Sequence, residues 1–144
     1  MNKSVLECIL FLMQKGDRMA EILIKRIYDP FDESDGDRIL VDRLWPRGIS
    51  KEKAKLTGWA KDIAPSNELR KWFGHSADLF EEFKSKYLKE LRSDEHKWEK
   101  VNELSQMATA KRMTLLYAAK EPMNNHARVL REELLRIIAE SENR

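Results

Sequence analysis

The sequence is poor in the residues on which several well-marked chemistries depend. It has a single cysteine, Cys8, so it can form neither an internal disulfide nor a cysteine-based zinc site. Its histidines, His75, His96 and His126, are scattered and form no His-Glu-x-x-His motif, so we expect no metal site. The sequence also has no glycine-rich phosphate loop, dinucleotide fingerprint or Gly-x-Ser-x-Gly elbow. These absences exclude several familiar enzyme classes and indicate no particular cofactor.

Long apolar runs and an excess of one charge are missing as well. The apolar run Val5–Met13 is interrupted by Glu7 and is too short to span a bilayer, so we expect no membrane segment. The 27 basic and 25 acidic residues leave a formal net charge of only +2, which gives no general reason to expect nucleic acid as a partner. The single cysteine favours the reducing cytoplasm.

The first 18 residues are set aside from the functional argument. Lys15-Gly16-Asp17 precedes Met19, and codons for these three residues can contain a purine-rich ribosome-binding sequence. We therefore expect Met19 to be the natural start and residues 1–18 to be a leader or extension. Residues 19–144 are then expected to form one domain.

Three short apolar runs predict the strands of a sheet. They are Ile22–Tyr28, Arg38–Val41 and Met113–Tyr117. Continuous apolar runs of this length are typical of strands that are covered on both faces, as in parallel sheets. The chain between the second and third runs has helical patterns. The sequence therefore predicts an α/β fold with a small, mainly parallel β-sheet of about three to four strands flanked by helices.

Capping residues and apolar spacing predict five helices. We expect the first four to be capped by Ser50, Ser66, Ser76 and Ser93, and the last to begin near Asn124 as its cap. Two of these helices have clear inward faces: Leu79, Phe83, Tyr87 and Leu91 in one, and Trp98, Val101, Leu104 and Met107 in the other. Trp72 and Phe73, which end the second helix, are expected in the core.

The richest stretch of the chain is Asp42-Arg43-Leu44-Trp45-Pro46-Arg47-Gly48, directly behind the second apolar run. Charged and aromatic groups at the end of a buried strand are costly unless they meet partners. One interpretation is a buried pair, Asp42 with Arg43 or with Arg47, that anchors a loop. The other is a ligand site, because arginine forks bind carboxylate or phosphate and a tryptophan face can stack on a ring.

Polar residues also follow the other two strands. In open α/β sheets, ligands bind outside the carboxyl ends of the strands. If the strands are parallel, one sheet edge collects Tyr28, the residues from Asp42 to Arg47, Tyr117 and Lys120, and the last helix can point its N-terminus there. Such an arrangement suits a phosphate or a carboxylate.

The residues of this candidate site can be given roles. We expect Arg43 and Arg47 to hold the anion and Trp45 to wall the pocket. The catalytic candidates are Asp42, His126 and Tyr117, with His126 as the acid–base group because its intrinsic pKa lies near neutrality. The other ligand-binding candidates are Tyr28, Lys120 and Asn125. Two alternatives stay open: His126 as a structural helix-start residue, and Lys120 as a solvated loop charge.

With these residues in view, the chain resembles the YeaO-like family, a domain of unknown function (488) in small bacterial and archaeal proteins. The resemblance covers about residues 22–135. It is carried by Arg26-Ile27-Tyr28-Asp29, Arg38–Gly48, Ala64-Pro65-Ser66, Leu69–His75, Thr114–Lys120 and Asn125-His126-Ala127. The resemblance implies an α/β domain but no established reaction.

Two functional hypotheses follow. The first is a small cytosolic enzyme or ligand-binding domain that recognises a phosphorylated or nucleotide-like anion. The second is a non-enzymatic module that binds nucleic acid or a protein through a basic stripe formed by Arg70-Lys71-Trp72 with Lys51, Lys53 and Lys55. Acidic residues interleave this stripe, so the first hypothesis is favoured. The sequence does not indicate an oligomeric state.

Overall fold

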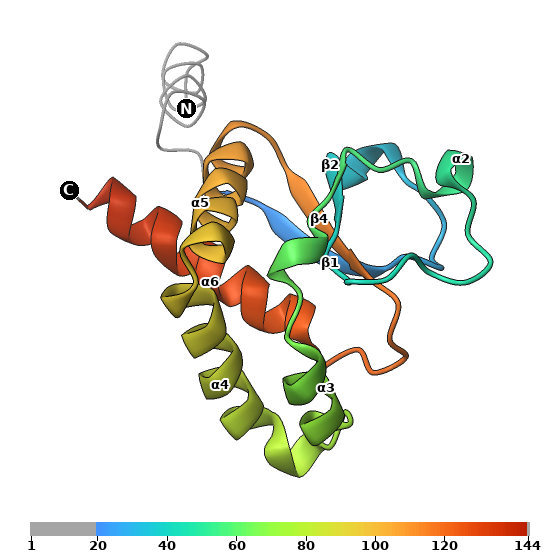
Figure 1. The fold of residues 1–144 in the computed structure, drawn as a ribbon. Coiled ribbons are helices and arrows are strands. Elements are labelled where there is room, and N and C mark those ends of the chain that lie inside the picture. Colours follow the sequence, from blue (N-terminus) through green and yellow to red (C-terminus); the bar gives the residue numbers. More distant parts are fainter. Residues whose placement is uncertain (1–19, 144) are drawn as a thin grey trace, which may run out of the picture.

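Four parallel strands form one sheet in the computed structural model, which describes residues 20–143 (Figure 1). Their order in the sheet is β1-β4-β2-β3, and every neighbouring pair is parallel. The strands are β1 (Ile22–Arg26), β2 (Asp37–Leu40), β3 (Gly58–Trp59) and β4 (Met113–Tyr117). The predicted parallel sheet is thus confirmed. The expectations for residues 1–18, including Cys8, and for Met19 fall outside the described residues.

Within residues 20–143, five α-helices connect or cover these strands. They are α2 (Lys51–Ala54), α3 (Asn67–Phe73), α4 (Phe80–Ser93), α5 (Glu95–Ala110) and α6 (His126–Glu142). Short 3-10 turns occupy Glu33–Asp35, Lys61–Ile63 and Ala77–Leu79. Figure 1 shows α5 and α6 beside the sheet, with α2 and its long loops on the other side. None of the helices within residues 20–143 is long and apolar enough to cross a membrane.

Two predicted caps are confirmed and three are wrong. Ser50 accepts a hydrogen bond from the Lys53 amide, and Ser66 from the Leu69 amide. Ser76 makes no side-chain cap bond, because the chain first forms the 3-10 turn Ala77–Leu79 before α4 begins. Ser93 is the last residue of α4, and Asp94 caps α5 through the Lys97 amide. Asn125, not Asn124, caps α6 by accepting from the Arg128 amide.

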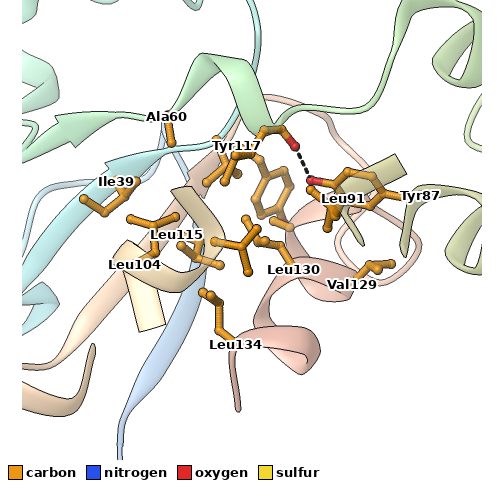
Figure 2. Packing of buried hydrophobic residues seen from close by; sticks show 14 of the residues in the cluster. Ile39, Ala60, Tyr87, Leu91, Leu104, Leu115, Tyr117, Val129, Leu130 and Leu134 are labelled. Atoms are coloured by element: carbon orange, nitrogen blue, oxygen red, sulfur yellow. Dashed lines mark hydrogen bonds between the residues drawn. The ribbon is translucent and has the colours of Figure 1, made fainter. Parts of the chain in front are cut away.

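The larger apolar core lies between the sheet and α4, α5 and α6. Figure 2 shows Leu115 of β4 packed among Leu104 of α5 and Leu130 of α6. The buried Tyr87 of α4 donates its hydroxyl to the carbonyl of Ile63 at 2.6 Å, the dashed line in Figure 2. This bond ties α4 to the segment that follows β3.

A smaller core covers the opposite sheet face. Ile27, Leu40 and Leu116 are buried there with Ala54, under Trp45, Ile49, Leu56 and Ala118. Successive strand residues face opposite sides, so Leu115 and Leu116 belong to different cores. Both faces of β4 are therefore covered, which explains why its apolar run is continuous.

A buried ion pair secures the start of β2. Arg38 is only 2% exposed, and its guanidinium binds the Asp35 carboxylate and, through two nitrogens, the carbonyl oxygen of Ala54 at 2.9 and 3.1 Å. Burial alone would raise the pKa of Asp35, but hydrogen bonds from the Asp32 amide and from Lys25 and Arg38 lower it overall. One of the two sequence interpretations of the polar stretch was a buried pair at Asp42, beyond the other end of the strand.

Candidate functional site

The carboxyl ends of β1, β2 and β4 lie at one edge because these strands are parallel neighbours. The register pairs Arg26 of β1 with Tyr117 of β4, and Leu40 of β2 with Leu116 of β4. The Arg26 side chain crosses the ends of the strands and donates to the carbonyl oxygens of Ala118 and Ala119. The residues that follow each strand therefore meet, as the parallel arrangement predicted.

Asp42 and His126 form a contact at the centre of this edge. Asp42 Oδ2 accepts a hydrogen bond from the Ala118 amide at 2.9 Å, and Asp42 Oδ1 lies 3.1 Å from His126 Nε2. His126 is the first residue of α6, so the helix start carries the imidazole to the end of β2. The two side chains are 17% and 13% exposed, so both are largely but not fully shielded from water.

The surroundings of the His126 ring fix its neutral tautomer. Nε2 lies 3.1 Å from the Val41 carbonyl oxygen as well as from the Asp42 carboxylate. Both neighbours can only accept, so Nε2 carries the proton and Nδ1 is the basic nitrogen of the neutral ring. The proton is directed at Val41, and Asp42 Oδ1 is consequently buried without a hydrogen bond of good geometry among residues 20–143.

Tyr87 packs against the ring of His126. Its ring meets the His126 ring edge to face, with 6.3 Å between the centroids. The phenol is fully buried, and this burial raises the pKa of Tyr87 well above its usual range. The Tyr87 hydroxyl is already bonded to the Ile63 carbonyl, so the position of the phenol is fixed. Its ring therefore helps to hold the imidazole of His126 in place.

A cleft of about 390 Å³ opens over this pair, and we call it the dyad cleft. Phe73 and Phe83, both buried core residues, contribute apolar surface to it, and the exposed Arg70, Lys71 and His75 line its rim. His75 adopts a left-handed conformation with φ of 57°, which is uncommon for a residue with a side chain. The cleft is lined by Asp42, Pro65, Arg70, Lys71, Phe73, His75, Phe83, Ala119 and His126.

A second hollow of about 430 Å³ adjoins the first, and we call it the Arg43 cleft. It shares Pro65 with the dyad cleft and is lined by Arg43, Lys61, Asp62, Ala64, Pro65, Ser66 and Lys97. Asp42 and Arg43 are consecutive residues, yet one lines each cleft. The peptide unit that joins Asp42 to Arg43 therefore connects the linings of the two clefts.

Only part of the predicted site comes together. Asp42 and His126 share the dyad cleft, and Arg43 lines its neighbour. Both Arg43 and Arg47 are exposed, so the predicted alternative of a buried pair between Asp42 and either arginine is wrong. The carboxylate pairs with His126 because the first turn of α6 reaches the end of β2.

The aromatic residues near the loop have structural contacts. Tyr28 donates its hydroxyl to the Arg47 carbonyl at 2.9 Å, and Trp45 donates its indole N–H to the Ile49 carbonyl at 2.6 Å. Trp59 donates to the Asp42 carbonyl at 2.7 Å. These bonds hold the loop between β2 and α2, while Tyr28, Trp45 and Arg47 line neither cleft.

The remaining predicted residues also lie outside both clefts. Tyr117 is buried in the core, and burial raises its pKa. Lys120 is exposed on the loop after β4. Asn125 is fully buried: its oxygen caps α6 and its amide donates to the Glu121 carbonyl at 2.9 Å. With both ends of its side chain bonded, Asn125 has a structural role.

The sequence interpretation missed the rim of the dyad cleft. Arg70 and Lys71 were assigned only to a basic stripe, and His75 was given no role in the site. Gly74 ends α3 in a left-handed conformation, with φ of 53°, and His75 follows in the same region. Trp72, expected in the core, is instead 38% exposed beneath the Lys86 ammonium. A glycine followed by histidine at a basic helix end was the available signal.

Within residues 20–143, no group of three or more His, Cys, Asp or Glu side chains is placed to hold a metal ion.

Comparisons with known proteins place this chain in a family. Residues 21–144 match the model of a family described as the inactive DUF488-N3 subclade. The chain is 47% identical over 113 residues to the uncharacterized protein YeaO of Escherichia coli (strain K12), covering 78% of this chain and 96% of that protein. It is 38% identical over 117 residues to an uncharacterized protein of Mycobacterium tuberculosis (strain H37Rv), covering 81% and 96%. No solved structure matches the chain.

Proposed function

The chain belongs to the YeaO-like DUF488 family, and on that premise we propose that it is a cytoplasmic ligand-binding domain for a small phosphorylated or nucleotide-like anion. The ligand occupies the dyad cleft. The observation that carries the proposal is the combination, in one cleft at the carboxyl ends of parallel strands, of the Asp42–His126 contact with Arg70, Lys71 and His75. A single cysteine fits the reducing cytoplasm.

The charges and surfaces of the dyad cleft suit such a ligand. Arg70 and Lys71 bring two permanent positive charges to the rim, against the one carboxylate of Asp42. An arginine fork recognises two phosphate or carboxylate oxygens at once, and a lysine adds a point charge. The apolar surface of Phe73, Phe83 and Pro65 offers contact to the uncharged part of the molecule.

A binding role is favoured over turnover by the description of the matched family as an inactive subclade. One observation keeps a catalytic role as the second candidate. The neutral His126 ring has its basic nitrogen at Nδ1, while Asp42 and Val41 orient the opposite nitrogen. In an enzyme, His126 would act as general acid–base and Asp42 as its positioning residue.

The nucleic-acid alternative loses part of its basis. The expected stripe joins Lys51, Lys53 and Lys55 to Arg70 and Lys71, but Figure 1 places α2 and α3 well apart, so these residues do not form one continuous strip.

Isothermal titration calorimetry with nucleoside monophosphates and sugar phosphates tests the proposal. We expect binding by at least one of them, and we expect Arg70→Gln/Lys71→Gln to weaken it by tenfold or more, because two charge-assisted contacts are lost. The matched control, Lys51→Gln/Lys53→Gln, removes the same charge from α2 and should leave the affinity unchanged. Equal losses in both double variants would indicate a general charge effect and contradict the site.

The same ligand separates binding from catalysis. His126→Gln should change affinity, and incubation of the native protein with the ligand should return it intact by mass spectrometry. Product formation that His126→Gln abolishes would establish the enzyme instead.

A further inference from the structure

We propose that the Arg43 cleft is the second half of the same site and binds further phosphate groups, so that the ligand is a nucleotide with at least two phosphates. This inference rests on the proposed function of the dyad cleft. The two hollows adjoin at Pro65, and consecutive residues, Asp42 and Arg43, line one each. A molecule with its nucleoside in the dyad cleft therefore passes its outer phosphates across Pro65 to Arg43.

The Arg43 cleft has the charge for this task. Arg43, Lys61 and Lys97 line it, with Asp62 as its one acidic residue. The Asp62 carboxylate is 3.3 Å from His96 Nε2, and Lys97 donates to the Ala64 carbonyl at 3.1 Å. The guanidinium of Arg43 has no hydrogen-bond or ion-pair partner in the part of the chain described, residues 20–143. Its fork is therefore available for two phosphate oxygens.

The loop that carries Arg43 is held in place before any ligand arrives. The Trp59 indole donates to the carbonyl of Asp42, immediately before Arg43, at 2.7 Å. Trp45 and Trp59 meet edge to face with 5.4 Å between their ring centroids, and Trp45 is bonded to the Ile49 carbonyl. A fixed backbone lowers the ordering cost of binding, since only the arginine side chain must be immobilised.

Acidic residues limit how far a phosphate chain can extend. Beyond Ser66, at the edge of the Arg43 cleft, the next hollow contains two acidic residues, Glu68 and Glu90, and one basic residue, Lys86, whose ammonium lies over the Trp72 ring. The Glu90 carboxylate accepts from both the amide and the hydroxyl of Ser66. A longer polyanion would meet these carboxylates, so the arrangement favours a nucleoside diphosphate or triphosphate over a single-stranded nucleic acid, which needs a continuing basic groove.

Calorimetry with matched pairs tests the second subsite: AMP and ADP, GMP and GDP, CMP and CDP, UMP and UDP. For at least one pair we expect the diphosphate to bind about tenfold tighter than the monophosphate, the gain of one charge-assisted fork. Arg43→Gln should remove that advantage, so that the diphosphate binds no more tightly than the monophosphate. Arg47→Gln, on the same loop but outside both clefts, should retain the advantage. Melting temperatures of both variants check that each is folded.

The outcomes separate the two proposals. A monophosphate that binds in a manner sensitive to Arg70→Gln/Lys71→Gln, without a diphosphate advantage, overturns the second subsite and leaves the dyad cleft standing. A diphosphate advantage that survives Arg43→Gln also overturns it. If no nucleotide of the panel binds, the second subsite is overturned, and the proposal for the dyad cleft is overturned as well unless a sugar phosphate binds there. If oligo(dT) binds more tightly than every diphosphate, with affinity that rises with length, the ligand class is nucleic acid and the inference is wrong.

Discussion

Burial divides the arginines around β2 into two kinds. Arg38 is enclosed, and each of its three guanidinium nitrogens has a partner, either Asp35 or the Ala54 carbonyl. Arg43 and Arg47 lie on the exposed loop beyond the strand. A charge without water is stable only with matched partners, whereas an exposed arginine is free to meet a ligand. The same residue type therefore anchors the fold at one end of β2 and faces solvent at the other.

This contrast predicts the effect of a conservative substitution. Arg38→Lys keeps the charge but loses the planar fork, so it should lower the free energy of unfolding by about 2–4 kcal/mol, the scale of a broken buried pair. Arg47→Lys, at an exposed position, should change it by less than about 0.5 kcal/mol. Urea unfolding followed by circular dichroism measures both. Equal, small effects would mean that the Asp35–Arg38 pair contributes little to stability.

At the scale of elements, the start of α6 decides where the imidazole lies. Asn125 is the cap, and it also bonds the Glu121 carbonyl in the loop after β4. The Glu121 carboxylate in turn accepts from the amides of Met123 and Asn124. These bonds fix the first turn of the helix and hence the contact of His126 with Asp42.

Neighbouring asparagines offer a matched test of this cap. Asn125→Ala removes the cap and leaves the partly buried Glu121 carbonyl without its donor, so we expect a loss of about 2 kcal/mol in the free energy of unfolding. Asn124→Ala should cost less than about 0.5 kcal/mol, because no hydrogen bond of its side chain is found within residues 20–143. Thermal and urea unfolding of both variants give the comparison. A larger loss for Asn124→Ala than for Asn125→Ala would indicate that Asn124, the residue expected from the sequence, is the cap.

At the scale of the whole molecule, one carboxylate connects two helices that are distant in sequence, α4 and α6. Glu133 of α6 is 1% exposed and binds Arg92 of α4 through two oxygens and Arg136 through one. Burial by itself would raise its pKa, but the hydrogen bonds and charges of the two arginines lower it to about 2. An ionised Glu133 therefore links α4 to α6 beside their shared apolar core.

The pH dependence of stability should reveal this group. The unfolded chain binds the Glu133 proton more readily than the folded protein does, so this contribution is complete above pH about 4.5 and is lost as pH falls toward about 2. The lowered pKa of Glu133 corresponds to about 3 kcal/mol in the free energy of unfolding. The difference in unfolding free energy between the native protein and Glu133→Gln should shrink over this interval. A difference that stays constant with pH would contradict the assignment.

The sequence predicted which sheet edge carries the site, but not which of its side chains contact one another. Asp42 and His126 were expected at the same sheet edge, because one follows a strand and the other begins a helix that can point there. Which partner Asp42 takes could not be predicted, since Arg43 and Arg47 are closer in sequence than His126. Arg70 and His75 entered the cleft through the placement of α3, which no periodic pattern specifies.

By itself, the sequence determined the parallel sheet, the inward helix faces and the polar stretch behind β2, because apolar spacing and turn residues act over a few neighbouring positions. The tertiary structure alone decided which charges are buried, which partner Asp42 takes and where the clefts open. Those outcomes depend on contacts between segments tens of residues apart, such as Val41 with His126. A local sequence pattern contains no information about such contacts. The free-energy cost of a charge depends on its burial, and burial is decided only when the chain has packed.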